Sequence, residues 1–327
     1  MAKQPPEGPP GDSPETVPDA ASDFLPDTKE GKPPDEAATG GEEPTPVAPP
    51  AAATVEAPKP KSTVNLELLL NWVPKYKRRK QYILFVEDVS VSFDGFKALD
   101  GLTLYLTEGE LRCVIGPNGA GKTTMMDVIT GQTRPDSGEA WFMDRINLLE
   151  RDEVFIAQQG ICRKFQKPSV FESLTAAQNL VLALKAEKSV FSTFRARIGK
   201  EDRDFLDEVM GQIGLREDAG KLAGNLSHGQ KQWLEIGMLL AQRPRLLLLD
   251  EPVAGMTPQE IDHTKELLLG LEGNHTILVV EHDMEFVRSI ARQVTVLHQG
   301  RVLAEGGMAE VSANREVVEA YLGGSDA

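Results

Sequence analysis

The segment GPNGAGKTT, residues Gly116 to Thr124, is the strongest indication of fold class in this sequence. It has the spacing GxxxxGK[ST], and it lies between the apolar segment LRCVI and the helix-like segment TTMMDVIT. This strand–loop–helix context is the one that a phosphate-binding loop requires. We therefore expect an α/β fold of the P-loop NTPase class, with a parallel sheet at its core.

The chemistry of this loop is that of a nucleoside triphosphate site, with ATP and Mg²⁺ as the expected ligands. Successive main-chain N–H groups can surround the phosphates, and the following helix adds the partial positive charge of its N-terminus. Lys122 is expected to bridge β- and γ-phosphate oxygens, and Thr123 to ligate Mg²⁺ through its hydroxyl. The predicted nucleotide-binding residues here are Gly116, Pro117, Asn118, Gly119, Ala120, Gly121, Lys122, Thr123 and Thr124.

A second apolar run, RLLLLDEP at residues 245–252, ends in two carboxylates. Near-continuous apolar runs are typical of strands buried on both faces of a parallel sheet. Asp250 is predicted to join Thr123 as a metal ligand, and Glu251 to orient or deprotonate the attacking water. With the phosphate loop, this pair indicates a Mg²⁺-dependent ATPase.

Composition narrows the class of protein further. The 327 residues include 50 acidic against 35 basic side chains, a net charge of −15, which argues against a general nucleic-acid-binding surface. Two cysteines, Cys113 and Cys162, are too few for a disulfide framework. Without an apolar run long enough to span a bilayer or to form a secretory signal, we expect a peripheral protein on the cytoplasmic side of the cell membrane.

The N-terminal part differs in composition from the rest. Residues 1–60 contain 15 of the 22 prolines and 12 acidic residues against 4 lysines, so we expect a disordered acidic tail. Residues 61–81 form an apolar and then basic linker ending in KYKRRK, which can lie on an anionic membrane face, on a partner or on the domain itself. One folded domain is expected over residues 82–322, followed by a short tail at 323–327.

The segment LSHGQ, Leu226 to Gln230, resembles the signature loop of the ATP-binding cassette (ABC) family. In that family a Ser and a Gly at a helix N-terminus grip a γ-phosphate, which assigns nucleotide contacts to Ser227, Gly229 and Gln230. An ordinary serine N-cap is the simpler alternative for this segment alone. The order of the three motifs favours the family.

The resemblance implies roles for further residues. Gln166, in RKFQKPSVF, matches the glutamine that reaches Mg²⁺ and the attacking water. His282, after TILVVE, resembles the switch histidine that contacts the γ-phosphate. Phe93 matches the aromatic residue that stacks on adenine, with Phe96 as a competing candidate.

Two positions depart from the family pattern. In AGMTP, Thr257 stands where the family usually has an aspartate, which puts in doubt the communication that this loop makes across the dimer. His228 replaces the glycine most common at the third signature position. Because the contacts are made by the residues on either side, we expect the signature loop to function.

The family also implies an architecture and an assembly. An antiparallel β subdomain built from the N-terminal strands and an α-helical subdomain at about 167–225 accompany the parallel core. The helical subdomain is expected to present a groove to integral-membrane permease subunits. Two cassettes are expected to close head to tail around two nucleotides, and ATP hydrolysis reopens them.

Segments such as AGMTP, VEHDMEFV and VTVLHQGRVLAEG look like the branched-chain amino acid and urea importer branch, and CRKFQKPSVFESLTAAQNL is most similar to its urea-transporting members. The resemblance implies an importer ATPase for urea that acts with permease subunits, a second ATPase subunit and, indirectly, a periplasmic solute-binding protein. A heterodimer is expected over a homodimer.

Four alternatives stay open. They are a branched-chain amino acid importer, a lipid or lipopolysaccharide exporter, a cassette protein acting on DNA or ribosomes, and an inactive cassette used for interaction. Cassette proteins of the third class usually carry two cassettes or long coiled-coil insertions. The last is disfavoured by the presence of Lys122, Asp250, Glu251 and His282.

Overall fold

The computed structural model describes residues 79, 81–165, 169–184 and 199–322, with residues 321 and 322 described by their backbone alone. The chain divides into two units at residues 58 and 59, and all described residues fall in the second. The predicted tail 1–60, nearly all of the linker 61–81 and the last residues 323–327 lie outside the described residues. Their boundaries remain predictions, as do those of the predicted helical subdomain.

The first sheet is antiparallel and has the strand order β2-β1-β4-β5. Its first two strands are the segments in which apolar and polar residues alternate, and they pair from Leu84 opposite Leu106 to Phe93 opposite Phe96. The inward residues of β1, such as Val89 and Val91, are buried. The strands are β1 (Leu84–Phe93), β2 (Phe96–Leu106), β4 (Ser137–Phe142) and β5 (Ile146–Asn147).

The second sheet has the order β10-β9-β3-β8-β7-β6. Strands β6, β7, β8, β3 and β9 run parallel to their neighbours, and β10 is added antiparallel to β9. This confirms the predicted P-loop NTPase fold with a parallel core. The strands are β3 (Leu111–Ile115), β6 (Ile161–Lys164), β7 (Leu246–Asp250), β8 (Thr276–Val280), β9 (Gln293–His298) and β10 (Arg301–Gly306).

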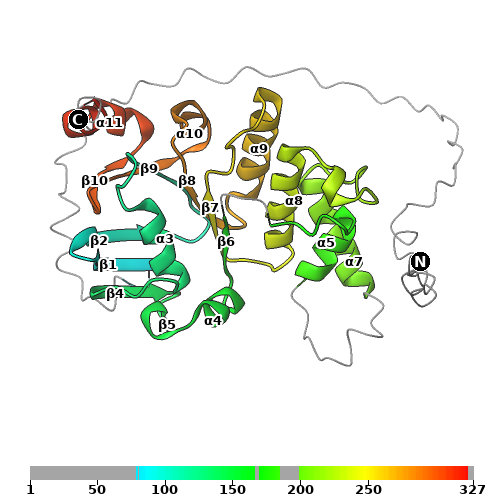
Figure 1. The fold of residues 1–327 in the computed structure, drawn as a ribbon, viewed down its shortest axis with the longest axis horizontal. Coiled ribbons are helices and arrows are strands. Elements are labelled where there is room, and N and C mark those ends of the chain that lie inside the picture. Colours follow the sequence, from blue (N-terminus) through cyan, green and yellow to red (C-terminus); the bar gives the residue numbers. More distant parts are fainter. Residues whose placement is uncertain (1–78, 80, 166–168, 185–198, 323–327) are drawn as a thin grey trace, which may run out of the picture. The chain divides into compact units, whose positions relative to one another are not determined.

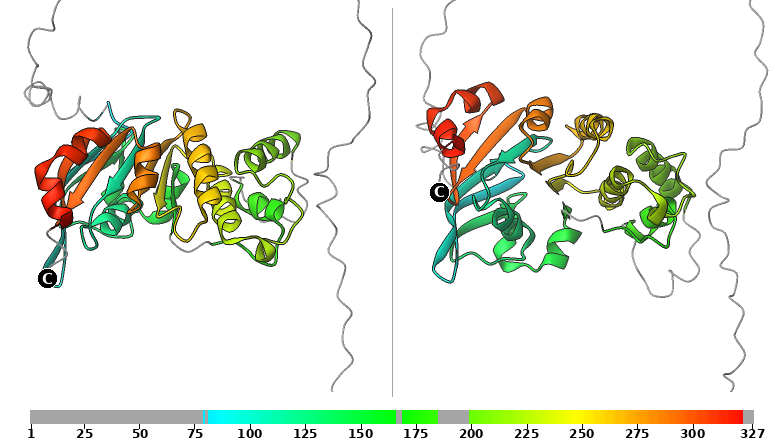
Figure 2. Two further views of the ribbon diagram at one scale, coloured as in Figure 1. Left: turned by 90° about the horizontal axis from the view of Figure 1, so that it is seen from above. Right: turned by 45° about the horizontal axis from the view of Figure 1, so that its top comes forward.

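Helices follow the parallel strands, as Figure 1 shows. Helix α3 begins directly after the phosphate loop, and α5, α7 and α8 pack on one another. Figures 1 and 2 show α9 beside α8 in each view. The helices are α3 (Lys122–Thr130), α4 (Glu153–Gln158), α5 (Ala176–Ala183), α7 (Lys200–Gln212), α8 (His228–Leu240), α9 (Pro258–Leu271), α10 (Met284–Ile290), α11 (Met308–Ala313) and α12 (Arg315–Leu322).

The parallel sheet separates two hydrophobic cores. Alternate residues of one strand serve opposite cores, so Leu246 and Leu248 pack with the antiparallel sheet and α3, while Leu247 and Leu249 pack with the helices on the other face. Burial on both faces explains why β7 and β8 are almost wholly apolar. Because side chains at the strand ends stand at the rim between these cores, the strand ends are where polar groups gather.

Candidate active site

The phosphate loop, residues 116–124, joins β3 to α3. Gly119 and Gly121 have φ of +79° and +100°, values that favour glycine over residues with a Cβ. A Cβ on Gly121 would lie 2.6 Å from the main-chain O of Ala98, whereas the Cβ position on Gly119 faces open space. One side of the loop is therefore packed against the antiparallel sheet, and the other is free for a ligand.

Lys122 is the first residue of α3, and its side chain turns back over the loop. Its Nζ donates to the main-chain O of Gly116 at 2.7 Å and of Pro117 at 3.1 Å. Burial lowers the pKa of this ammonium, while the nearby carboxylates of Glu251 and Asp250 act in the opposite direction. The cation is thus held at the loop by weak neutral acceptors that a phosphate oxygen can replace.

One cavity, which we call the nucleotide cavity, brings most of the predicted site together. Its volume is about 310 Å³. Both aromatic candidates, Phe93 and Phe96, lie on its wall and are exposed, so both remain candidates for the adenine contact. Its lining residues are Phe93, Phe96, Ala98, Asn118, Gly119, Ala120, Gly121, Lys122, Thr123, Thr124, Asp250, Glu251 and Val280.

Asp250, the last residue of β7, is tied to the neighbouring strand β6. It accepts a hydrogen bond from the guanidinium of Arg163 at 3.2 Å, and Arg163 also pairs with Asp127 of α3 at 2.5 Å. Burial raises the pKa of the Asp250 carboxyl, and the Arg163 guanidinium acts against that rise. Arg163 is a residue that sequence reasoning missed, because only the pairing of β6 with β7 brings it to the site.

Glu251 follows in an unusual backbone conformation. Its φ is +46°, and its N–H donates to the main-chain O of Val280 at 2.9 Å. The carboxylate reaches His282, whose Nδ1 lies 3.4 Å from Oε1 of Glu251. The predicted base and the predicted switch histidine are therefore neighbours at the ends of β7 and β8.

Glu281 is a second residue that sequence reasoning missed. It is buried directly after β8, and its carboxylate accepts main-chain N–H bonds from Val253 at 3.3 Å, His282 at 3.0 Å and Asp283 at 3.4 Å. Burial raises its pKa, and these hydrogen bonds act against the rise. Glu281 joins the loop after Glu251 to the backbone of His282. The signal in the sequence was a charged residue at the end of the apolar run TILVV.

The signature turn, residues 226–230, begins helix α8. Ser227 is the N-cap, and its side chain and that of Gln230 form a capping box. The Ser227 hydroxyl donates to Glu260 Oε1 at 3.0 Å, and His228 Nε2 lies 3.2 Å from the main-chain O of Ala254. None of these five residues is among those that line the nucleotide cavity. Within one chain, the signature turn and the phosphate loop are separate sites.

The donor set fits Mg²⁺ held mainly by phosphates. Thr123 and Asp250 offer oxygen ligands in the nucleotide cavity, and Mg²⁺ usually binds one or two protein oxygens together with nucleotide phosphates. Among the described residues, no group of three or more His, Cys, Asp or Glu side chains forms a metal cage. Gln166, predicted as a further ligand, lies outside the described residues.

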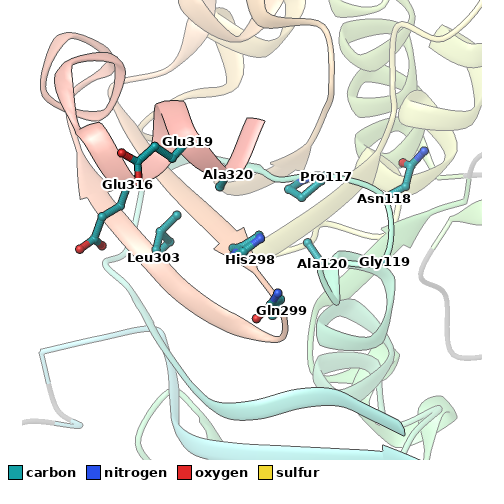
Figure 3. Close-up of a pocket in the computed structure, with 10 residues that line it drawn as sticks. All are labelled: Pro117, Asn118, Gly119, Ala120, His298, Gln299, Leu303, Glu316, Glu319 and Ala320. Atoms are coloured by element: carbon teal, nitrogen blue, oxygen red, sulfur yellow. The ribbon is translucent and has the colours of Figure 1, made fainter. Parts of the chain in front are cut away.

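A second cavity, the C-terminal cavity, lies on the other side of the phosphate loop and measures about 670 Å³. Figure 3 shows Pro117, Asn118, Gly119 and Ala120 along one wall, Glu316 and Glu319 of α12 on the opposite side, and His298 and Gln299 between them. Pro117, predicted as a nucleotide contact, lines this cavity and is not among the lining residues of the nucleotide cavity.

In the part of the chain that the structure describes, no helix is long and apolar enough to cross a membrane.

Sequence comparison places relatives over nearly the whole described domain. A family model described as ABC transporter matches residues 99–254, and one described as Branched-chain amino acid ATP-binding cassette transporter matches residues 301–327. The high-affinity branched-chain amino acid transport ATP-binding protein BraF of Pseudomonas aeruginosa is 36% identical over 257 residues, covering 74% of this chain and 98% of the relative. LivG of Salmonella typhimurium, described in the same words, is 36% identical over 253 residues with the same coverage.

Solved structures of cassettes match the fold. The ADP conformation of MJ1267, an ATP-binding cassette of an ABC transporter, aligns with a TM-score of 0.65 and 30% identity, covering 74% of this chain and 99% of that one. The cbiO1 protein from Clostridium perfringens, part of the cbiONQ transporter complex, aligns with a TM-score of 0.62 and 27% identity, covering 75% and 96%.

Proposed function

Since the chain belongs to the ABC transporter family, as an ATPase subunit of the branched-chain amino acid import type, we propose that it drives import of a branched-chain amino acid. The ATPase chemistry is that of the family, and the observation that supports it is the nucleotide cavity, where the phosphate loop faces Asp250 and Glu251. The solute is suggested by the names of the relatives and by the family model over residues 301–327.

The sequence resemblance favoured urea, whereas the relatives favour the alternative of branched-chain amino acids. The solute is difficult to predict from this sequence because the residues named for catalysis act on ATP and not on the solute. Urea and amino acid importers can therefore share all of them, and the solute leaves no chemical mark on the nucleotide cavity.

In the proposed reaction each residue acts on the nucleotide or its water. Lys122 exchanges its bonds to Gly116 and Pro117 for phosphate oxygens. Thr123 and Asp250 would hold Mg²⁺, which would supply neutralisation of the phosphate charge when bound. Glu251 accepts the proton of the attacking water at its carboxylate, and His282, 3.4 Å away, orients that carboxylate.

We further propose that the site is completed by a second ATPase subunit, either another copy or a related chain. The signature turn does not line the nucleotide cavity of its own chain, so we assign Ser227 and Gly229 to the nucleotide of a neighbour. Binding ATP more tightly in the closed pair than in the open one drives closure.

A third cavity of about 200 Å³ is a candidate contact for a permease, and none of its lining residues belongs to the segment 167–225 in which the groove was predicted. It lies between α4 and β6 on one side and α8 on the other, and Phe165 on its wall is 45% exposed. We propose that a cytoplasmic segment of a permease subunit docks there. Arg163 lines the same cavity and donates a hydrogen bond to Asp250 at the end of β7. The proposed docking site is therefore connected to the nucleotide cavity through a single side chain.

Glu251→Gln tests the catalytic assignment. The carboxamide keeps the shape of the side chain but cannot accept the proton, so steady-state ATP turnover should fall by at least about a hundredfold while ATP still binds. Equal turnover in Glu251→Gln and the parent would remove Glu251 as the base.

Lys122→Ala should instead weaken nucleotide binding by about tenfold or more, because charge-assisted hydrogen bonds are lost.

Uptake measurements test the solute. Cells lacking this gene should lose high-affinity uptake of labelled leucine and keep that of urea, and the parent gene should restore uptake where Glu251→Gln does not. Loss of urea uptake with unchanged leucine uptake would instead favour the urea reading. Loss of neither would remove the importer assignment for both solutes.

A further inference from the structure

The carboxylate of Glu260, in the first turn of α9, lies over the N-terminus of α8. Its Oε1 accepts the hydroxyl hydrogen bond of Ser227 at 3.0 Å. The main-chain N–H of Gly229 also acts to lower the pKa of this carboxylate. A Cβ on Gly229 would overlap the Glu260 carboxyl group, so the glycine is needed for this approach. The Ser227 hydroxyl, which is expected to grip a phosphate, is thus already bound to an anion of the same chain.

Glu260 is held equally firmly from its own helix. Its Oε2 accepts from the main-chain N of Thr257 at 2.9 Å and from the Thr257 hydroxyl at 3.1 Å. These bonds, with the hydroxyl of Ser227, lower the pKa of the Glu260 carboxyl, which is therefore ionised at neutral pH. One negative charge bridges the N-termini of α8 and α9, where the partial positive charges of two helices meet.

We propose that Glu260 is an internal occupant of the anion site at the N-terminus of α8, which the γ-phosphate of a neighbouring subunit's ATP must displace. The inference rests on the proposed function, in which the signature turn serves a neighbour's nucleotide. The Ser227 hydroxyl has one proton to donate, so it can bond Glu260 or a phosphate oxygen, but not both. In addition, a carboxylate next to an arriving phosphate repels it.

Helix capping alone does not require this arrangement. A capping box needs the third-position glutamate to accept the N–H of the N-cap residue, and Oε2 of Glu260 does that for Thr257. Helix α11 has the glutamate half of this box, in which Glu310 accepts from Gly307 N at 2.9 Å. The additional bond from Oε1 to Ser227 distinguishes Glu260. Glu310 therefore offers a matched control.

Glu260→Gln is the informative change. A glutamine keeps one acceptor oxygen, which can cap α9 by accepting the Thr257 N–H, while its NH₂ group faces Ser227 and cannot accept the hydroxyl. The fold is therefore kept while the negative charge and the bond from Ser227 are removed. In a full-length Glu251→Gln background, which retains ATP, we expect the ATP concentration for half-maximal association of two chains to fall by about fivefold. Glu310→Gln should leave it unchanged. Analytical ultracentrifugation with Mg-ATP measures association, and a thermal unfolding midpoint equal to that of the background confirms folding.

Affinity for a fluorescent ATP analogue in dilute solution, where chains are separate, should be the same in all variants. If the background chain associates with ATP and Glu260→Gln requires as much ATP or more, Glu260 supports the signature turn and is not its competitor; the Glu260 proposal is then overturned and the proposed function stands. If the background chain binds ATP but no variant associates, the pair of two copies is wrong, and the Glu260 proposal falls with it.

Discussion

Thr257 shows at the residue scale how a departure from a family pattern can preserve structure. Its side chain accepts from Glu260 N as the N-cap of α9, and Pro258 follows in the first helical position. Threonine and aspartate are both accepted at N-caps, because each offers an oxygen to the free N–H groups of the first turn. Either residue can therefore cap the helix, but only the threonine hydroxyl can also donate to Glu260, as it does at 3.1 Å.

Thr257→Ala should destabilise the domain by about 1 kcal/mol, because the cap oxygen is lost. Thr257→Asp keeps the cap oxygen but loses the hydroxyl bond to Glu260 and places two carboxylates together, so it should restore only part of that stability. Urea unfolding followed by circular dichroism measures both. An alanine variant as stable as the parent would mean that Glu260 and Pro258 start the helix without the cap.

Several site residues were predictable from sequence and others were not, for a physical reason. The residues 118–124, Asp250 and Glu251 line the nucleotide cavity. They were predictable because each belongs to a motif of consecutive residues. Arg163, Glu260 and Glu281 act across strands or helices. Their contacts depend on which element lies beside which, and no local pattern contains that information.

At the element scale, the end of β6 is joined to α8 by a buried ion pair. Lys164 is fully buried, and its Nζ lies 3.8 Å from Oε2 of Glu235 and donates to the main-chain O of Phe165 at 3.0 Å. Glu235 also accepts from Ser169 N at 3.2 Å. Burial lowers the pKa of Lys164 and raises that of Glu235, and each partner opposes the shift of the other. The signature helix is thereby tied to residues on both sides of 166–168.

Lys164→Met should destabilise the domain by about 3–5 kcal/mol, because it leaves the Glu235 carboxyl buried without a cation. The double variant Lys164→Met with Glu235→Leu should recover most of that loss, since apolar replacement of a buried pair is often neutral. Guanidinium unfolding curves provide the comparison.

Lys231→Met is the matched control, because Lys231 pairs with Glu172 at 2.8 Å on the surface. Its loss should cost less than about 1 kcal/mol. If Lys164→Met cost as little as Lys231→Met, the buried pair would contribute nothing to joining β6 and α8.

Strand β7 was predictable at this scale, because burial on both faces leaves the near-continuous apolar run seen in RLLLLDEP. The antiparallel addition of β10 to the parallel sheet was not. A short hairpin at Gln299 and Gly300 directs it, and both residues have positive φ. The sequence VTVLHQGRVLAEG contains that turn, but this segment was used only as a sign of the family, and no hairpin was predicted from it.

For the molecule as a whole, the described residues that build the two hydrophobic cores all lie at or after Ile83. Deleting residues 1–60 should therefore leave the thermal unfolding midpoint and the ATP affinity unchanged, as differential scanning calorimetry and nucleotide titration would measure. A lower midpoint or weaker binding would show that the N-terminal segment contributes to the folded domain. A change confined to membrane association would assign it to localisation.

The left-handed backbone of Glu251 has an evolutionary consequence. A non-glycine residue in that conformation costs on the order of 1 kcal/mol, which asparagine or glycine at the position would recover. A duplicated gene released from selection for hydrolysis would gain stability by such a replacement and would drift towards it. Retention of glutamate in descendants of this chain would thus indicate continuing selection for ATP hydrolysis. Its replacement would mark the lineage in which a copy lost that function.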